Sequence, residues 1–121
     1  SSMTPTIVAR DGELFMVTGS PGGRTIINTV LQTILNVVDH GMNAQAAVDA
    51  GRIHHQWLPD QLYYERHGFS LDSLNGLRAL GHGLVEQPYQ GVAEVIVVDP
   101  ESGRLQGGVD LRVPDGGVAG H

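Results

Sequence analysis

The stretch that decides the fold reads ELFMVTGSPGG and covers residues 13–23. Its first seven residues, Glu13 to Gly19, are rich in strand formers, and Asp11-Gly12 before them accepts the positive φ of a two-residue hairpin turn. We therefore predict a hairpin whose first strand is the run from Thr6 to Arg10. The glycine-rich end at residues 19–23 then leads into a helix and forms a strand-to-helix turn.

The helix predicted after this turn runs from Arg24 to His40, and Gly41 follows as a C-terminal stop. Its apolar residues recur at i, i+3, i+4 and i+7, which predicts a broad buried face made of Ile27, Val30, Leu31, Ile34, Leu35, Val37 and Val38. The opposite face is polar but uncharged. A fully solvated face usually carries charge, so this face is expected to be covered as well.

The rest of the sequence alternates short helical and extended patterns. We predict helices at 44–50 and 70–80, an ordered loop at 52–60, and strands at 61–66, 92–98 and 104–109. In the second of these helices the inward residues are expected to be Leu71, Leu74 and Leu77. The order ββααβαββ indicates an α+β fold, with helices against an antiparallel or mixed sheet. At 121 residues and 12.9 kDa, residues 1–121 are expected to form a single domain.

Composition excludes several classes of function. Seven Lys and Arg against thirteen Asp and Glu give a net charge of −6, so nucleic-acid binding is not expected. The absence of cysteine excludes a disulfide scaffold, a thiolate zinc site and a cysteine nucleophile. No apolar run reaches the roughly 18 residues of a membrane span. Residues 1–6 do not read as a signal peptide, so either the protein is not exported or its true N-terminus lies elsewhere.

The turn at residues 19–23 is the strongest candidate for chemistry. Its glycines let the backbone approach a ligand, and the free N–H groups of a helix start favour an anion or an oxyanion. The turn matches neither a Walker A loop nor a dinucleotide-binding fingerprint. Glycine is also common in such turns for geometry alone, so spacing leaves both interpretations open.

Other polar residues favour structural interpretations. His54 and His55 lack metal-ligand spacing, so one is expected to pack beside Trp57 and the other to face solvent. Asp110 and Arg112 share one face of an extended segment, which favours an ion pair over catalysis. Ser1 could be an N-terminal nucleophile or simply the first residue of the chain. We expect neither a metal nor a cofactor.

Four blocks of this sequence resemble the small subunit of the γ-glutamyltransferase (γ-glutamyl transpeptidase) family. They are SSMTPTIV at 1–8, TGSPGG at 18–23, LNVVDHGMN at 35–43 and RIHHQWLPD at 52–60. The ending also resembles the family's Asp-Pro-Arg segment and Ala-Gly-Tyr terminus, with Leu111 and His121 as substitutions. The likeness is weakest from Gln61 to Gln90.

The resemblance implies a partial αββα sandwich of the N-terminal-nucleophile hydrolase type. It implies an enzyme that transfers or hydrolyses γ-glutamyl groups of glutathione and related amides, with Ser1 and Ser2 binding the substrate carboxylate. Gly22 and Gly23 would form the oxyanion hole. A related acylase, or a non-catalytic anion-binding or subunit-interaction domain, is the alternative.

The resemblance also indicates which parts lie outside the 121 residues. The family's nucleophilic threonine precedes the position of Ser1, and its large subunit carries a carboxylate-binding arginine. We therefore expect a C-terminal portion of a small subunit, inactive alone, whose partners are the rest of the precursor and the γ-glutamyl substrate. A periplasmic or secreted location is implied by resemblance only. After Gly23 the family often has Ser-Arg where this chain has Arg24-Thr25. The isolated chain, with uncovered sheet edges, is expected to form a homo-oligomer.

Overall fold

The computed structural model describes residues 3–120, which fall into two compact units. One unit comprises the chain up to Ala50 together with the chain from Gly91 onward, and the other is Gly51–Gln90. None of the helices within residues 3–120 is long and apolar enough to cross a membrane. The expectation of a single domain over residues 1–121 stays a prediction.

The first unit is built on an antiparallel sheet of four strands in the described residues. The strands are β1 (Thr6–Arg10), β2 (Glu13–Gly19), β6 (Glu94–Val98) and β7 (Leu105–Gly108), in the order β1-β2-β6-β7. Asp11 and Gly12 have φ values of 52° and 82°, as a tight hairpin turn requires. The predicted hairpin is confirmed, and β6 and β7 pair as a second hairpin. One β-bulge interrupts the pairing of β1 with β2 between Val8 and Ala9.

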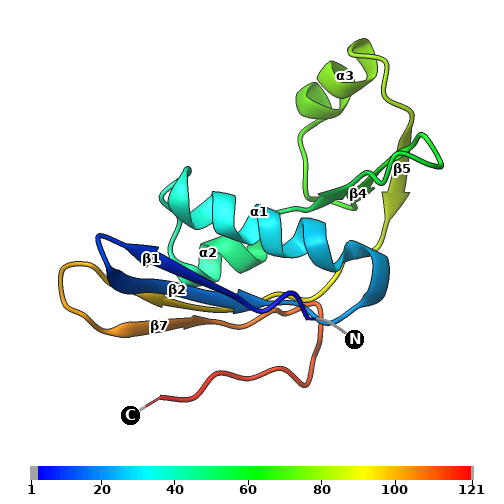
Figure 1. Cartoon of the computed structure of the whole chain (residues 1–121). Helices are drawn as coiled ribbons and strands as arrows, with labels where there is room; N and C mark the ends of the chain where they lie inside the picture. Colours follow the sequence, from blue (N-terminus) through cyan, green and yellow to red (C-terminus); the bar gives the residue numbers. More distant parts are fainter. Residues whose placement is uncertain (1–2, 121) are drawn as a thin grey trace. The chain divides into compact units, whose positions relative to one another are not determined.

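Two helices follow β2 and lie over one face of this sheet (Figure 1). A single 3-10 turn, η1 (Gly23–Thr25), precedes α1 (Ile26–Val38), and α2 (Ala44–Asp49) follows. Asn43 begins α2 because its side chain accepts a hydrogen bond from the Ala46 amide at 2.8 Å. The core between helices and sheet is formed by Phe15, Met16, Val37, Ala44, Ala47, Val48, Ala93, Val95 and Val97.

The exposure of α1 differs from the predicted pattern. Val30 and Val37 are buried, but Ile27, Leu31, Leu35 and Val38 are exposed, so the broad buried apolar face is wrong in part. The prediction that the polar face is covered is confirmed at Thr29 and Thr33, which are almost fully buried. An apolar period shows which residues share a side of a helix. It does not show how many neighbours that side has.

The sheet face opposite these helices carries a row of apolar side chains. Ile7 pairs with Val17 and Val17 with Ile96, so the row crosses β1, β2 and β6, and Gly107 of β7 lies next to Ile96. Ile7, Val17 and Ile96 are exposed. Val118 lies over Gly107, where a Cβ atom would collide with its side chain. We call Ile7, Val17 and Ile96 the outer-face row.

The second unit contains a smaller mixed sheet. Strand β4 (Leu62–Glu65) pairs antiparallel with β3 (Ile53–His54) and parallel with β5 (Leu84–Gln87). Helix α3 (Leu71–Ala79) is capped by Ser70, whose hydroxyl accepts from the Ser73 amide at 3.1 Å. Leu74 of α3 is buried. The prediction that Leu71 points inward is wrong, because this side chain is exposed.

Candidate functional site

The turn between β2 and α1 contains the two glycines expected to bind an anion. Gly22 has a φ of 126° and Gly23 a φ of 65°, a region that residues with a Cβ atom rarely adopt. Both residues are exposed. Within residues 3–120 no acceptor is bonded to the amide of Gly22 or of Gly23. Two neighbouring N–H groups are therefore available to a ligand.

Ser20 anchors the start of this turn. The residue is fully buried, and its amide donates to the Met3 carbonyl at 2.9 Å. Its hydroxyl donates to the Pro21 carbonyl at 3.0 Å. The end of β2 is thus fixed to the N-terminal segment immediately before the glycines.

Thr25 closes the other end of the turn. It occupies the N-cap position of α1, yet its side chain caps no amide of that helix. Instead the hydroxyl donates back to the Gly22 carbonyl at 3.3 Å. This bond is long for a hydroxyl donor, so its contribution to stability is small.

The charges around the turn favour an anion. Neither η1 nor the first turn of α1 carries an acidic residue, and Arg24 follows Gly23 directly. The positive end of the helix dipole lies at the same place. The arrangement can stabilise negative charge that develops on an oxygen.

The predicted carboxylate-binding residues Ser1 and Ser2 lie outside the described residues. Met3, the next residue in the chain, is the one whose carbonyl accepts from Ser20. The backbone next to the serine pair is therefore bonded to the turn that carries Gly22 and Gly23.

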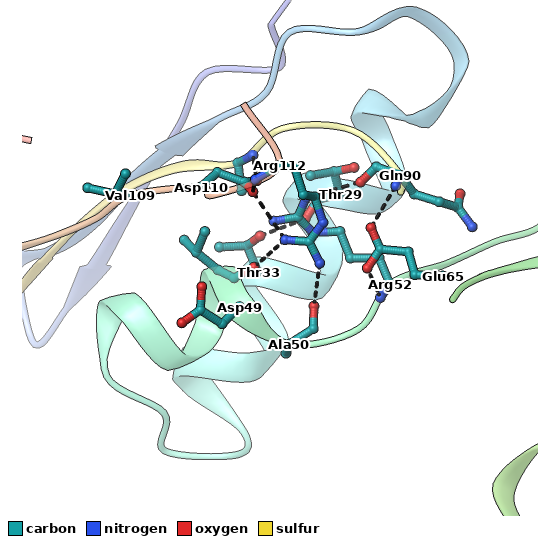
Figure 2. A network of polar contacts seen from close by, with 12 residues as sticks. Thr29, Thr33, Asp49, Ala50, Arg52, Glu65, Gln90, Val109, Asp110 and Arg112 are labelled. Atoms are coloured by element: carbon teal, nitrogen blue, oxygen red, sulfur yellow. Dashed lines mark hydrogen bonds and ion pairs between the residues drawn. The ribbon is translucent and has the colours of Figure 1, made fainter. Parts of the chain in front are cut away.

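A buried carboxylate organises the second unit (Figure 2). Glu65 accepts from the amide of Arg52 at 2.9 Å and from the amide of Gln90 at 2.6 Å. The Arg52 guanidinium donates to the Gln90 carbonyl at 3.0 Å. Both charged residues are almost fully buried. The sequence contains no local signal for this cluster, because its members are far apart in the chain.

The predicted ion pair of Asp110 and Arg112 is confirmed (Figure 2). Arg112 also donates to the carbonyls of Val48 and Ala50 at 2.8 and 3.0 Å, at the C-terminal end of α2. Asp110 accepts from the Ala93 amide at 2.7 Å. The pair joins three segments of the first unit, which is a structural role.

The histidine pair has ordinary partners. His54 is buried and its Nε2 lies 2.9 Å from Gln56 Oε1, whereas His55 Nε2 lies 3.1 Å from Asp60 Oδ1. His55 Nδ1 also accepts from the Trp57 amide at 3.1 Å, but the Trp57 side chain is exposed, so the expected contact beside Trp57 is with its backbone. Within residues 3–120 no group of three or more His, Asp or Glu side chains could hold a metal ion.

Known proteins resemble this chain over its full length or nearly so. The family model described as gamma-glutamyltranspeptidase matches residues 1–120. The glutathione hydrolase proenzyme of Escherichia coli K12 is 48% identical over 121 residues, covering 100% of this chain and 20% of the relative.

Solved structures of related proteins also resemble this chain in sequence and fold. A gamma-glutamyltranspeptidase mutant from Helicobacter pylori is 44% identical with a TM-score of 0.88, covering 93% of this chain and 62% of that one. A cephalosporin acylase from Bacillus halodurans is 30% identical with a TM-score of 0.83, covering 97% and 22%. The predicted α+β fold, part of the N-terminal-nucleophile hydrolase type, is confirmed.

The chain spans about one fifth of the length of the E. coli relative. The family model nevertheless matches nearly all residues of this chain, including the Gly22-Gly23 turn and the segment containing Asp110 and Arg112. The chain therefore belongs to the gamma-glutamyltranspeptidase family.

Proposed function

We propose that these 121 residues supply part of the active site of an enzyme that transfers or hydrolyses γ-glutamyl groups of glutathione and related amides. Gly22 and Gly23 form the oxyanion hole, and Ser1 and Ser2 bind the α-carboxylate of the glutamyl group. The observation that supports this most directly is the pair of unbonded amides at Gly22 and Gly23, next to the start of α1.

The chemistry needs such a pair of donors. The nucleophile is a threonine hydroxyl upstream of Ser1, which attacks the γ-carbonyl carbon and places a negative charge on its oxygen. Two N–H groups aimed at that oxygen stabilise the tetrahedral intermediate in acylation and again in deacylation. When the C–N bond breaks, the amine leaves with the proton of the threonine hydroxyl, and the glutamyl group stays on the threonine oxygen as an ester. Water or an amino acid then attacks this ester and releases the threonine with its proton.

The bond between Ser20 and Met3 supports the placement of the serine pair. Met3 follows Ser2 directly and its carbonyl is bonded to the turn, which supports a single site for the carboxylate contacts and the oxyanion donors. The partners of this segment are the γ-glutamyl substrate, the large subunit and the rest of the small subunit. The exported location implied by resemblance, periplasmic or secreted, remains part of this proposal.

A chromogenic γ-glutamyl anilide tests the proposal. The full-length protein that carries these residues should release the aniline from the γ-glutamyl substrate and not from the matched α-glutamyl anilide. The isolated 121-residue chain should be inactive with both, because the nucleophile is not part of it. Turnover by the isolated chain, or none by the folded full-length protein, would contradict the proposal.

One neighbour supports a second candidate. The cephalosporin acylase from Bacillus halodurans shares the fold at 30% identity, and an acylase would use the same oxyanion hole on another acyl group. Competition between the γ-glutamyl anilide and a β-lactam side-chain amide, measured with one preparation of the full-length protein, distinguishes the two substrates.

We also propose that the isolated chain self-associates. The outer-face row is exposed. Val17 and Ile96 of this row line a hollow of about 610 Å³ together with Met3, Pro5, Thr18 and Glu94. An exposed apolar patch of this kind favours association with a second copy. Sedimentation of the isolated chain at high micromolar concentration tests this.

A further inference from the structure

The two amide donors of the turn belong to the peptides Pro21–Gly22 and Gly22–Gly23. Both peptides are trans, because Leu58–Pro59 is the sole cis bond in the part of the chain that the structure describes. In a trans peptide the carbonyl and the following N–H lie in one plane and point in opposite directions. A group that holds the Pro21 carbonyl therefore sets the direction of the Gly22 N–H. The same relation connects the Gly22 carbonyl with the Gly23 N–H.

Ser20 holds the first of these carbonyls. Its hydroxyl lies 3.0 Å from the Pro21 oxygen, and its own amide is bonded to Met3 at 2.9 Å. Because the residue is fully buried, its hydroxyl has a fixed place from which to donate.

Thr25 holds the second carbonyl. A threonine at an N-cap position normally accepts a hydrogen bond from an amide in the first turn of its helix. Thr25 makes no such bond, and its hydroxyl donates to the Gly22 carbonyl at 3.3 Å instead. Gly91 faces the same hydroxyl, since a Cβ atom there would lie 3.4 Å from Thr25 Oγ1. The missing side chain at Gly91 leaves room for this arrangement.

We propose that Ser20 and Thr25 are positioning residues that aim the Gly22 and Gly23 amides at the oxyanion. This inference rests on the proposed function of the turn. Adjacent glycines have the widest backbone freedom of any residue pair, so their peptide planes need an external constraint. An oxyanion hole acts through donors whose directions are fixed before the charge develops. The two hydroxyls fix these directions by holding the carbonyls of the same peptides.

The test uses the full-length protein with a γ-glutamyl anilide, and compares Ser20→Ala, Thr25→Val and Thr25→Ser. We expect kcat to fall roughly tenfold in Ser20→Ala, less than the ~10²–10³ of losing a donor outright. The fall in Thr25→Val should be smaller than in Ser20→Ala, because the bond to the Gly22 carbonyl is longer. KM should be almost unchanged, because the donors act mainly in the transition state. Thr25→Ser retains the hydroxyl and should keep the wild-type kcat.

Thr33→Val is the matched control for Thr25→Val. It makes the same substitution in α1 and removes a hydroxyl that donates to the Thr29 carbonyl at 2.8 Å, away from the turn. We expect wild-type kcat for this variant. An equal loss in Thr33→Val would overturn the inference, because the effect would then come from the stability of α1.

Two further outcomes distinguish this inference from the proposed function on which it rests. Wild-type kcat in both Ser20→Ala and Thr25→Val, or a rise in KM alone, would overturn the positioning role while γ-glutamyl transfer stands. A folded wild-type protein without turnover of the anilide would overturn both.

Discussion

Asp110 and Arg112 form a buried ion pair across one intervening residue, with Arg112 Nη1 3.2 Å from Asp110 Oδ1 and side chains only 2% and 13% exposed. The Arg112 guanidinium also donates to the backbone carbonyls of Val48 and Ala50. One side chain thus neutralises a buried carboxylate and fixes the C-terminal end of α2.

We expect Arg112→Met to lower the free energy of unfolding by about 3 kcal/mol, because it leaves the Asp110 carboxylate buried without its partner. Urea denaturation measures the change. The control is Arg66→Met, which breaks the 2.8 Å pair with Glu86, whose side chains are 58% and 44% exposed. An exposed pair of this kind contributes about 0–1 kcal/mol. Equal losses in the two variants would contradict the structural role of Arg112.

Gly91→Ala is expected to destabilise the first unit strongly. A Cβ atom at this position would lie in the space of the Thr29 hydroxyl, and the φ of 63° disfavours alanine as well. Gly103→Ala is the control, since its φ is 70° and no atom lies within 4 Å of the added Cβ. The control should lose about 1–2 kcal/mol from backbone strain alone. The difference between the two midpoints of denaturation measures the collision, and Thr29→Ala should recover part of it.

The Asp99 carboxylate should titrate below its ordinary value. The Ser102 hydroxyl, followed by the Glu101 amide, lowers the pKa of Asp99 from 3.8. Because the folded-state pKa is depressed, the stabilisation is complete above the unfolded value and is lost as pH falls through the folded one. Ser102→Ala should raise the pKa of Asp99 toward 3.8, as followed by carboxyl NMR. No change in this variant would exclude the hydroxyl as the main cause.

Ile96→Lys should weaken self-association of the isolated chain. Ile96 lies in the outer-face row between Val17 and Gly107, so a charge there interrupts the apolar surface. Leu80→Lys makes the same change in net charge at an exposed apolar residue outside this face, and should leave association unaltered. Sedimentation velocity across a concentration series compares the two. An equal effect of both substitutions would indicate that net charge, and not the face, controls association.

Local signals predicted much of this fold. The Asp11-Gly12 turn and the predicted starts of the helices at 44–50 and 70–80 depend on residues within four positions of one another. The structure confirms the turn and both helix starts, which Asn43 and Ser70 cap. Strand β5 was not predicted, because its four residues become a strand only by parallel pairing with β4, some twenty residues away. The short β3 lies within the predicted loop for a similar reason.

The candidate site was predictable only in part. The glycine-rich turn is recognisable in the sequence. Its adjacent glycines indicate a backbone with positive φ, and the helical pattern that follows indicates a helix start. The bonds of Ser20 and Thr25 depend on which way two hydroxyls point, and no spacing rule contains that information. The exposure of Leu31 likewise depends on which residues cover α1. The spacing of apolar residues within α1 does not show this.

The β-bulge between Val8 and Ala9 limits how the first sheet can grow. Strand β1 is the first strand of that sheet, so its outer backbone groups are available for a new strand. The extra residue of the bulge is Phe15 on β2, and the bulge increases the local twist of the pair, so a straight incoming strand cannot follow β1 along its whole length. Extension of the sheet into fibrils is therefore disfavoured at this edge. Copies of the chain are expected to associate through their exposed sheet faces instead.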